Sequence, residues 1–262
     1  MLRALFRKFA FLGPQSARDA GKLTVVLDLD ETLCYVFHPQ EATGFQYQPD
    51  IKEDAIIDYK TQKTVLYVYK RPNLDKFLDY LDENYEPIIW STGVKEYVDL
   101  VVDAIDPKRI FRNRLYQEHC DYERPFGYPQ YEYVKDIKKL RDDISRIVMV
   151  EDDWPGMLKQ PDNFVFLDKF EAWFQDEHLE KNVPNTLKEI KDLPDIRPYL
   201  RAKFMLKYSW AQQGMLYELS PQDLKMAEVI AKYGLKDYEK LKLKYNQLFD
   251  PNMKYIESDK LW

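Results

Sequence analysis

The feature that most constrains the fold of this chain is a short apolar run that ends in closely spaced acidic residues. Residues 23–27 read LTVVL, and the sequence DLDETL follows directly from Asp28 to Leu33. A continuous aliphatic and β-branched run without alternation is typical of a parallel strand covered on both faces. Ligands of open α/β sheets bind beyond the carboxyl ends of such strands, where Asp28 and Asp30 would stand. Acidic turns often only cap the next helix, but this one, directly after a buried strand, favours a phosphoryl-transfer site.

Three further apolar segments are predicted to be strands, at residues 86–90, 145–150 and 163–167. The first ends at Ser91 and Thr92, and the second ends in acidic residues. Helical periodicity predicts helices starting at Pro72, over residues 94–105 and from Lys135 to Leu140. Strands that alternate with helices predict an α/β fold with a parallel sheet. The polar ends of the strands are therefore expected to meet at one edge of that sheet.

Two segments are predicted to be antiparallel additions to this sheet. Residues 64–72 alternate like an exposed strand and predict a flap over the catalytic edge. Residues 110–134 predict an antiparallel insertion with a turn near Pro125 to Pro129. The aromatic side chains of the flap either pack on the sheet or hold an extended peptide; they are Phe45, Tyr47, Tyr67 and Tyr69.

The charge of the chain is unevenly distributed. The formal net charge is -6 over 262 residues, yet residues 1–22 and the segment beyond residue 199 are both basic. The middle of the chain is therefore strongly acidic, which argues against a nucleic-acid partner because phosphates need a basic surface. Two cysteines, Cys34 and Cys120, match neither a disulfide framework nor a zinc site. The sequence contains no uncharged apolar run of about 18 residues, so no transmembrane span is predicted.

The two ends of the chain differ from its middle. Residues 1–22 form a basic N-terminal segment, in which residues 1–13 are amphipathic and match a mitochondrial targeting segment as well as a first helix that packs on the protein or on a partner. Residues 201–262 predict a helical extension, with helices over 220–235 and 236–249 and with Trp210 and Trp262 as anchors. This extension docks either on its own domain, taken as residues 23–200, or on a partner.

The polar residues at the strand ends match the needs of phosphate-ester hydrolysis. Asp28 can attack phosphorus as a nucleophile, and Asp30 can protonate the leaving oxygen and then activate water. Ser91 or Thr92 can donate a hydrogen bond to a phosphoryl oxygen, and Lys135 can supply a fixed positive charge. Mg²⁺ prefers oxygen ligands and needs only a few carboxylates, so Asp28 and one acid from another strand end would suffice.

These residues and their order resemble the haloacid-dehalogenase superfamily. The narrower resemblance is to the domain shared by the small carboxy-terminal-domain phosphatases, also called the NLI-interacting-factor domain, and by the presequence-receptor subunit of the mitochondrial inner-membrane translocase. Five segments in family order carry the resemblance: DLDETL from Asp28, KRPNLDKFL from Lys70, IIWSTGVKEYVDLVVDAIDP from Ile88, VKDIKKLRDDISRIVMVEDD from Val134, and PDNF from Pro161. The resemblance implies a Rossmann-like parallel sheet with helices on both faces, a small antiparallel insertion and no large cap.

The resemblance also implies a role for each matching residue. Asp28 would be the nucleophile and a metal ligand, and Asp30 the general acid/base that ligates metal through its backbone carbonyl. Thr32 would steady the loop, Ser91 would occupy the position of the second-motif threonine or serine, and Lys135 would be the phosphate-binding lysine.

The third metal ligand falls on the acidic run after residue 150. In the ungapped register, Glu151 and Asp152 match the terminal acidic pair of the family, which makes Asp152 the ligand of Mg²⁺. Glu151 stands where aspartate is usual, and Pro155 is displaced by one position because Trp154 precedes it. A shift of the register by one residue would promote Asp153 instead.

Two functions from different classes follow. The first is a Mg²⁺-dependent phosphatase of phosphoserine or phosphothreonine in proteins, with an aspartyl-phosphate intermediate. The alternative is a non-catalytic interaction subunit of a mitochondrial inner-membrane complex or import translocase. QEHC at Gln117 and DIRPYL at Asp195 are similar to the translocase-receptor branch, and the basic start suits mitochondrial targeting. Localisation is accordingly expected in mitochondria, or otherwise in the cytoplasm or nucleus.

Overall fold

The structure is a computed structural model of the chain. It describes residues 10–39, 49–124, 130–172, 176–212, 219 and 221–233. Several predictions fall outside these residues: the targeting-like residues 1–9, the flap residues Phe45 and Tyr47, the turn at 125–129 and the second tail helix at 236–249. Trp262 and the side chain of Trp210 also lie outside the described part.

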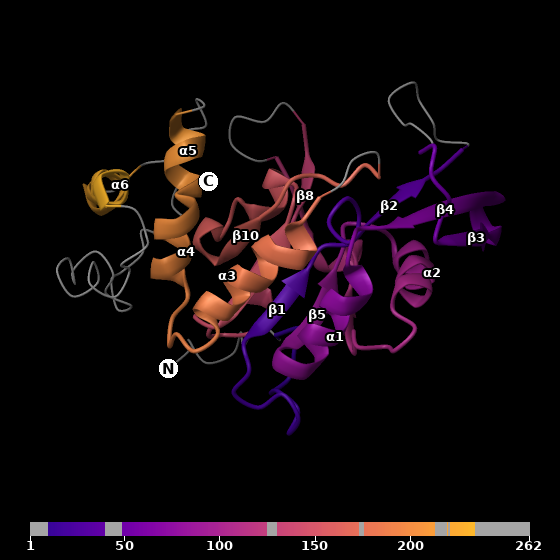
Figure 1. The fold of residues 1–262 in the computed structure, drawn as a ribbon, viewed down its shortest axis with the longest axis horizontal. Helices are drawn as coiled ribbons and strands as arrows, with labels where there is room; N and C mark the ends of the chain where they lie inside the picture. Colours follow the sequence, from indigo (N-terminus) through magenta and orange to yellow (C-terminus); the bar gives the residue numbers. More distant parts are fainter. Residues whose placement is uncertain are drawn as a thin grey trace, which may run out of the picture.

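The centre of the molecule is a sheet of five parallel strands in the order β10-β9-β1-β5-β6 (Figure 1). The strands are β1 (Thr24–Leu27), β5 (Glu86–Trp90), β6 (Asn113–Leu115), β9 (Ile147–Glu151) and β10 (Phe164–Phe166). The predicted α/β fold class is confirmed. Strand β6 was not predicted, because it is only three residues long and partly polar. Only its pairing with β5 makes this segment a strand.

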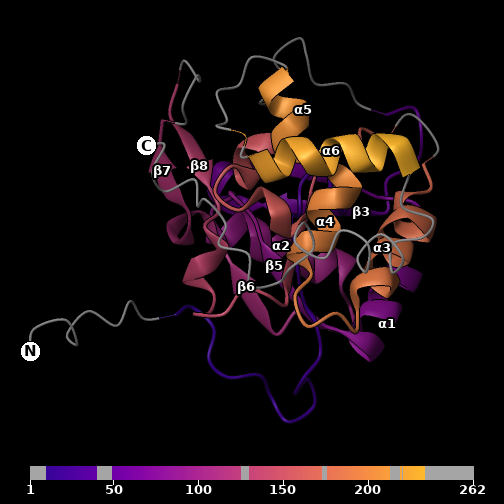
Figure 2. The same ribbon diagram turned by 90° about the vertical axis from the view of Figure 1, so that its left-hand side faces the viewer.

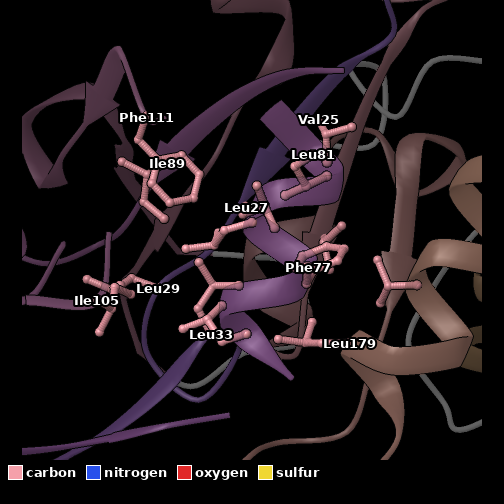
Figure 3. Packing of buried hydrophobic residues seen from close by; sticks show 14 of the residues in the cluster. Val25, Leu27, Leu29, Leu33, Phe77, Leu81, Ile89, Ile105, Phe111 and Leu179 are labelled. Carbon is pink, nitrogen blue, oxygen red and sulfur yellow. The ribbon is translucent and has the colours of Figure 1, made fainter. Parts of the chain in front are cut away.

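Both faces of this sheet are buried, which explains why the β1 segment does not alternate. Val25 and Leu27 point into one apolar cluster, whereas Val26 belongs to the cluster on the opposite face. Helices α1 (Leu74–Asn84), α2 (Lys95–Ile105) and α3 (Val183–Ile190) contribute to the first cluster. Figure 3 shows Phe77 and Leu81 of α1 beside Leu27 in this layer. The opposite face is covered by Leu12, by the segment from residue 137 to residue 144 and by Leu158.

The predicted helix from Lys135 to Leu140 is wrong: this segment holds only a 3₁₀ turn, η3 (Ile137–Lys139). The backbone carbonyls of Lys139 and Leu140 accept hydrogen bonds from the Phe11 and Leu12 N–H groups, at 2.7 and 3.2 Å. They are therefore not available to a further helical turn. Ile137 and Leu140 are fully buried against the sheet, so packing and the N-terminal segment override the helical pattern here.

Two small antiparallel sheets accompany the parallel one. The first has the order β2-β4-β3, formed by β2 (Cys34–Phe37), β4 (Thr64–Lys70) and β3 (Ala55–Tyr59). Strand β4 fits the predicted flap strand, but β2 and β3 were not predicted. The second sheet is the hairpin of β7 (Asp121–Glu123) and β8 (Glu132–Val134). The antiparallel insertion predicted at residues 110–134 is therefore right for this hairpin and wrong for residues 113–115, which join the parallel sheet as β6.

The described part of the C-terminal extension docks on the domain. Helix α4 (Arg197–Phe204) spans the predicted boundary at residue 200 between the domain and the extension. It is followed by α5 (Leu206–Gln212) and α6 (Pro221–Tyr233). Helix α6 lies across α4 and α5 (Figure 2) and buries Met226. The Arg201 guanidinium donates to the Asp162 carboxylate at 2.7 Å, which joins α4 to the segment before β10. Among the described residues, no helix combines the length and the apolar character needed to cross a membrane.

Candidate active site

The sheet topology brings two sets of acidic residues together. The chain leaves β1 for β5 and β6 on one side and then returns to β9 and β10 on the other, so β1 and β9 become neighbours. Asp28 follows β1, while Glu151 ends β9 and Asp152 follows it. In open α/β sheets this switch of direction opens a crevice at the carboxyl ends of the strands, which is where ligands bind.

The side chains of Asp28, Glu151 and Asp152 form one buried group. Each offers a carboxylate oxygen, and these oxygens all lie within 4.8 Å of one another. The Lys135 ammonium donates to Asp28 Oδ1 and, at 2.8 Å, to Glu151 Oε2. The Thr32 hydroxyl donates to Asp152 Oδ1 at 2.5 Å. The structure therefore brings Thr32 and Lys135 to the carboxylates.

Asp30 points to a different partner set although it is only two residues from Asp28. The Tyr97 hydroxyl donates to Asp30 Oδ1, and the Ser91 hydroxyl lies 3.4 Å from Asp30 Oδ2. Ser91 is fully buried, and its oxygen also accepts from the Gly93 N–H at 2.9 Å. The second residue considered for this role, Thr92, is exposed. The two aspartate side chains thus point in different directions. Asp28 points toward Lys135, and Asp30 points toward the end of β5 and toward α2.

The electrostatics of the site follow from burial and from an excess of negative charge. Burial, followed by the charge of Asp28, raises the pKa of Asp30 to about 7 and the pKa of Asp152 to about 7. The same two causes raise the pKa of Glu151 well above its ordinary value. Burial lowers the pKa of Lys135, but Asp28 and Glu151 outweigh this, so its net shift is upward and it stays a cation.

The loop that carries the aspartates is held in an uncommon conformation. Glu31 has a φ of 59°, in the left-handed region that non-glycine residues rarely adopt. The Arg71 guanidinium, which is fully buried, donates to the carbonyls of Glu31 at 3.3 Å and Thr32 at 3.1 Å. The Phe170 N–H donates to the Glu31 carbonyl at 2.8 Å. Such over-determined strain is found where side chains must be aimed precisely enough for chemistry.

The cluster of three carboxylates, from Asp28, Glu151 and Asp152, suits a divalent cation. Oxygen donors from a small number of carboxylates are the ligands that Mg²⁺ prefers. Of the three acids, Asp28 and Glu151 share Lys135, whereas the nearest cation to Asp152 among the described residues is Lys169 at 4.0 Å, so the acids outnumber the cations beside them. Asp153 is exposed and does not belong to this group, so the structure favours Asp152 over Asp153. The carboxylate of Asp30 also lies outside the group, which leaves its backbone carbonyl as the donor that the resemblance implies.

Sequence reasoning missed several residues that build the site. Arg71 and Tyr97 lie within the matched segments but received no role, and Glu151 was not expected to face Lys135. Lys169 was also missed: its ammonium lies 2.8 Å from Glu31 Oε2 and 4.0 Å from Asp152 Oδ2. The sequence signal for Arg71 was a basic residue between strand β4 and Pro72. No local pattern marks Lys169, because only the path of the chain after β10 brings it here.

Comparisons with known proteins give the family of this chain. A family model described as NLI interacting factor-like phosphatase matches residues 23–197. The chain belongs to this family, as the sequence resemblance predicted. The human "CTD small phosphatase-like protein" is 31% identical over 160 residues, which cover 60% of this chain and 51% of that protein. The human "Carboxy-terminal domain RNA polymerase II polypeptide A small phosphatase 1" is 32% identical over 167 residues, 63% of this chain and 57% of that protein.

A further relative is the "Phosphatase Herzog" of Drosophila melanogaster, 32% identical over 160 residues that cover 60% of this chain and 40% of that protein. The matches thus span about half the length of these curated relatives. Among solved structures, "Fcp1, an essential RNA polymerase II CTD phosphatase" is similar with a TM-score of 0.43 and 17% identity, over 92% of this chain and 69% of that chain.

Proposed function

We propose that this chain is a Mg²⁺-dependent phosphatase that hydrolyses phosphoserine or phosphothreonine in proteins. The observation that carries the proposal is the division of labour between two aspartates on one strained loop. Asp28 faces Lys135 and the carboxylates of β9, whereas Asp30 faces Ser91 and Tyr97. A nucleophile beside positive charge and a separate acid/base is the arrangement that two-step phosphate hydrolysis needs.

In the first step, a carboxylate oxygen of Asp28 attacks phosphorus, and the bond between phosphorus and the serine or threonine oxygen breaks. Asp30 gives its proton to that leaving oxygen; its pKa of about 7 keeps a proton available near neutral pH. In the second step, Asp30 takes a proton from a water molecule, which attacks the aspartyl phosphate and releases Asp28 and inorganic phosphate.

The remaining residues position these two. Lys135 fixes the orientation of Asp28 and sets positive charge beside the reacting phosphoryl group. Asp28, the Asp30 carbonyl and Asp152 would hold Mg²⁺, with Thr32 fixing Asp152. When bound, the metal supplies positive charge against the phosphoryl oxygens.

The substrate class is proposed from the surroundings of the site. In the described part of the chain, the additions around the catalytic edge are two small sheets rather than a large cap domain. A site without a large cap suits a phosphorylated residue within a polypeptide. The relatives reported above are named as phosphatases, and the name of one of them includes the carboxy-terminal domain of RNA polymerase II. A phosphoprotein is therefore the proposed substrate of this chain.

A second candidate function is the non-catalytic interaction subunit of a mitochondrial inner-membrane complex. Its support is the basic segment at residues 1–13 and the docked helices α4 to α6, for which the phosphatase chemistry has no use. Mitochondrial localisation belongs to this candidate; a cytoplasmic or nuclear location accompanies the phosphatase proposal. The two candidate functions differ in whether the site hydrolyses a phosphate ester.

The test is the hydrolysis of an aryl phosphate by the purified chain with Mg²⁺. We expect turnover in the wild type, loss of turnover with a chelator, and loss of turnover in Asp28→Asn. Asp79→Asn is a matched control, because Asp79 is a half-exposed carboxylate on α1 whose partner is Lys108. If folded wild-type protein with Mg²⁺ does no better than Asp28→Asn, the phosphatase proposal fails and the interaction subunit remains.

A further inference from the structure

Lys169 brings a second ammonium group to the candidate active site, beside the proposed metal ligand Asp152. Its Nζ atom lies 2.8 Å from Glu31 Oε2 and 4.0 Å from Asp152 Oδ2. Among the described residues it is the cation nearest to Asp152, since Lys135 bonds the other two acids of the cluster. Neither of the two proposed reaction steps uses Lys169, so its place at this edge of the sheet has another physical reason.

The backbone on either side of Lys169 is bound to the residues around the catalytic aspartates. The Asp168 carbonyl accepts a hydrogen bond from Arg71 Nη2 at 2.6 Å. The Phe170 N–H donates to the Glu31 carbonyl at 2.8 Å, and the side chain of Phe170 is buried. Lys169 therefore extends from a fixed backbone position beside the loop that carries both aspartates.

The two acids that face Lys169 differ in burial. The side chain of Glu31 is 33% exposed, whereas that of Asp152 is 2% exposed and accepts a hydrogen bond from Thr32 through Oδ1. The lysine ammonium bonds the exposed acid and stays 4.0 Å from the buried one, which is too far for a hydrogen bond. Asp152 Oδ2 thus keeps its lone pairs for a metal while it lies in the field of a positive charge.

The charge of Lys169 acts in opposite directions in the two states of the site. In the metal-free protein it offsets part of the mutual repulsion of three buried carboxylates. Toward a divalent cation on the same carboxylates, the ammonium is a like charge and opposes binding. Its side chain is 52% exposed, so solvent screens this repulsion in part and leaves metal binding possible.

We propose that Lys169 is a built-in cation of the site, which compensates Asp152 in the metal-free protein and weakens the binding of Mg²⁺ to the carboxylate cluster. The inference rests on the magnesium site of the proposed phosphatase function and adds a residue that sets its metal affinity. Replacing Lys169 therefore tightens Mg²⁺ binding, whereas replacing a ligand weakens it. A site weakened in this way fills and empties with the free Mg²⁺ concentration.

The test is a calorimetric titration of the purified chain with Mg²⁺ alone. Lys169→Met should lower the dissociation constant about tenfold, because it removes one like charge that is partly screened by solvent. Lys169→Arg keeps the charge and should bind Mg²⁺ as the wild type does. Lys181→Met is the matched control, because the Lys181 side chain is 53% exposed and bonds Glu177 at 2.7 Å. It should leave the dissociation constant unchanged.

Urea unfolding gives a second readout of the same inference. In a chelator, Lys169→Met should unfold at a lower urea concentration than the wild type, because Asp152 loses its compensating charge. Saturating Mg²⁺ should remove most of this deficit, since tighter binding adds to the stability of the folded state. A lysine that served only the fold would leave the same deficit with and without Mg²⁺.

An unchanged or higher Mg²⁺ dissociation constant in Lys169→Met would overturn the inference. The absence of Mg²⁺ binding in both the wild type and Lys169→Met would overturn it too, as would an equal tightening in Lys169→Arg. The aryl phosphate assay decides the proposed function separately. A chain that shows the expected difference in Mg²⁺ affinity but hydrolyses no ester would defeat the phosphatase and keep the role of Lys169. Equal circular dichroism spectra of the variants exclude unfolding as the cause.

Discussion

The two edges of the central sheet both bury acidic groups, but they treat them differently. At the amino edge, Glu86 begins β5, and its carboxylate accepts hydrogen bonds from three side chains. These bonds come from Thr24 at 2.5 Å, Gln15 at 3.0 Å and Arg141 at 2.7 and 2.8 Å. At the carboxyl edge, Asp28, Glu151 and Asp152 lie together and two of them share Lys135.

The pKa shifts of the two edges have opposite signs. Burial raises the pKa of Glu86, but the bonds from Arg141, Thr24 and Gln15 outweigh burial, so its pKa is lowered. Burial and a like charge raise the pKa of Asp152 to about 7. A charge cluster that serves stability is balanced by its partners. A cluster that binds a cation or performs chemistry is left unbalanced by the protein.

The largest expected contrast is in activity. Asp30→Asn should lower kcat for an aryl phosphate about 10²- to 10⁴-fold, because it removes the proposed general acid/base. Its stability should be equal to or higher than that of the wild type, since a buried carboxylate with a raised pKa is removed. At the other edge, Glu86→Gln should keep kcat and lose stability. Steady-state kinetics and urea unfolding measure both; a Glu86→Gln variant as inactive as Asp30→Asn would break the contrast.

The second contrast concerns the buried cations. Lys135→Met should cost about 4 kcal/mol of folding free energy, and Arg141→Met about 3 kcal/mol. Each substitution leaves buried negative charge without its positively charged partner. Mg²⁺ should restore part of the loss in Lys135→Met, since it can replace the missing positive charge there. It should not help Arg141→Met, because Glu86 offers no cluster of carboxylates. Urea unfolding with and without Mg²⁺ reads this out, and equal rescue of both variants would contradict it.

The third contrast separates Asp152 from Asp153. Mg²⁺ at about 100 times its dissociation constant should raise the free energy of unfolding of the wild type by about 2.7 kcal/mol, as expected for a ligand that binds only the folded state. Most of this gain should vanish in Asp152→Asn and persist in Asp153→Asn, which is the matched control. Thermal unfolding at several Mg²⁺ concentrations measures the gain. If Asp153→Asn loses the gain instead, the alternative register of the acidic run is right.

The smallest effect is a pH dependence at the amino edge. Because the pKa of Glu86 is lowered in the folded state, its ionised form contributes stability above its ordinary pKa of 4.5, and this contribution is lost as pH falls through the lower folded value. The difference in stability between the wild type and Glu86→Gln should therefore shrink below about pH 4.5. Urea unfolding in a chelator from about pH 6 to about pH 3 measures it. A difference that stays constant over this range would show that Glu86 is not stabilised as an anion.

Local sequence patterns predicted the parts of the fold that burial and periodicity govern. The non-alternating run of β1 and the helical period of α1 both appear in the structure near their predicted bounds. The segment predicted to begin a helix at Lys135 forms only a 3₁₀ turn, because the Lys139 and Leu140 N–H groups donate three residues back. The carbonyls that could continue a helix beyond residue 140 accept from Phe11 and Leu12 instead. Strand β6 was missed because pairing with β5, rather than its own composition, makes it a strand.

The sequence by itself determined the family, the α/β class and the residues that carry the proposed chemistry, because DLDETL and its companion motifs are local patterns. Only the tertiary structure decided how these residues face one another. The crossing of the chain from β6 back to β9 places Asp152 beside Asp28 and leaves Asp153 outside. Arg71 and Lys169 likewise take their places from contacts between distant segments, and the identities of neighbouring residues along the chain do not encode such contacts.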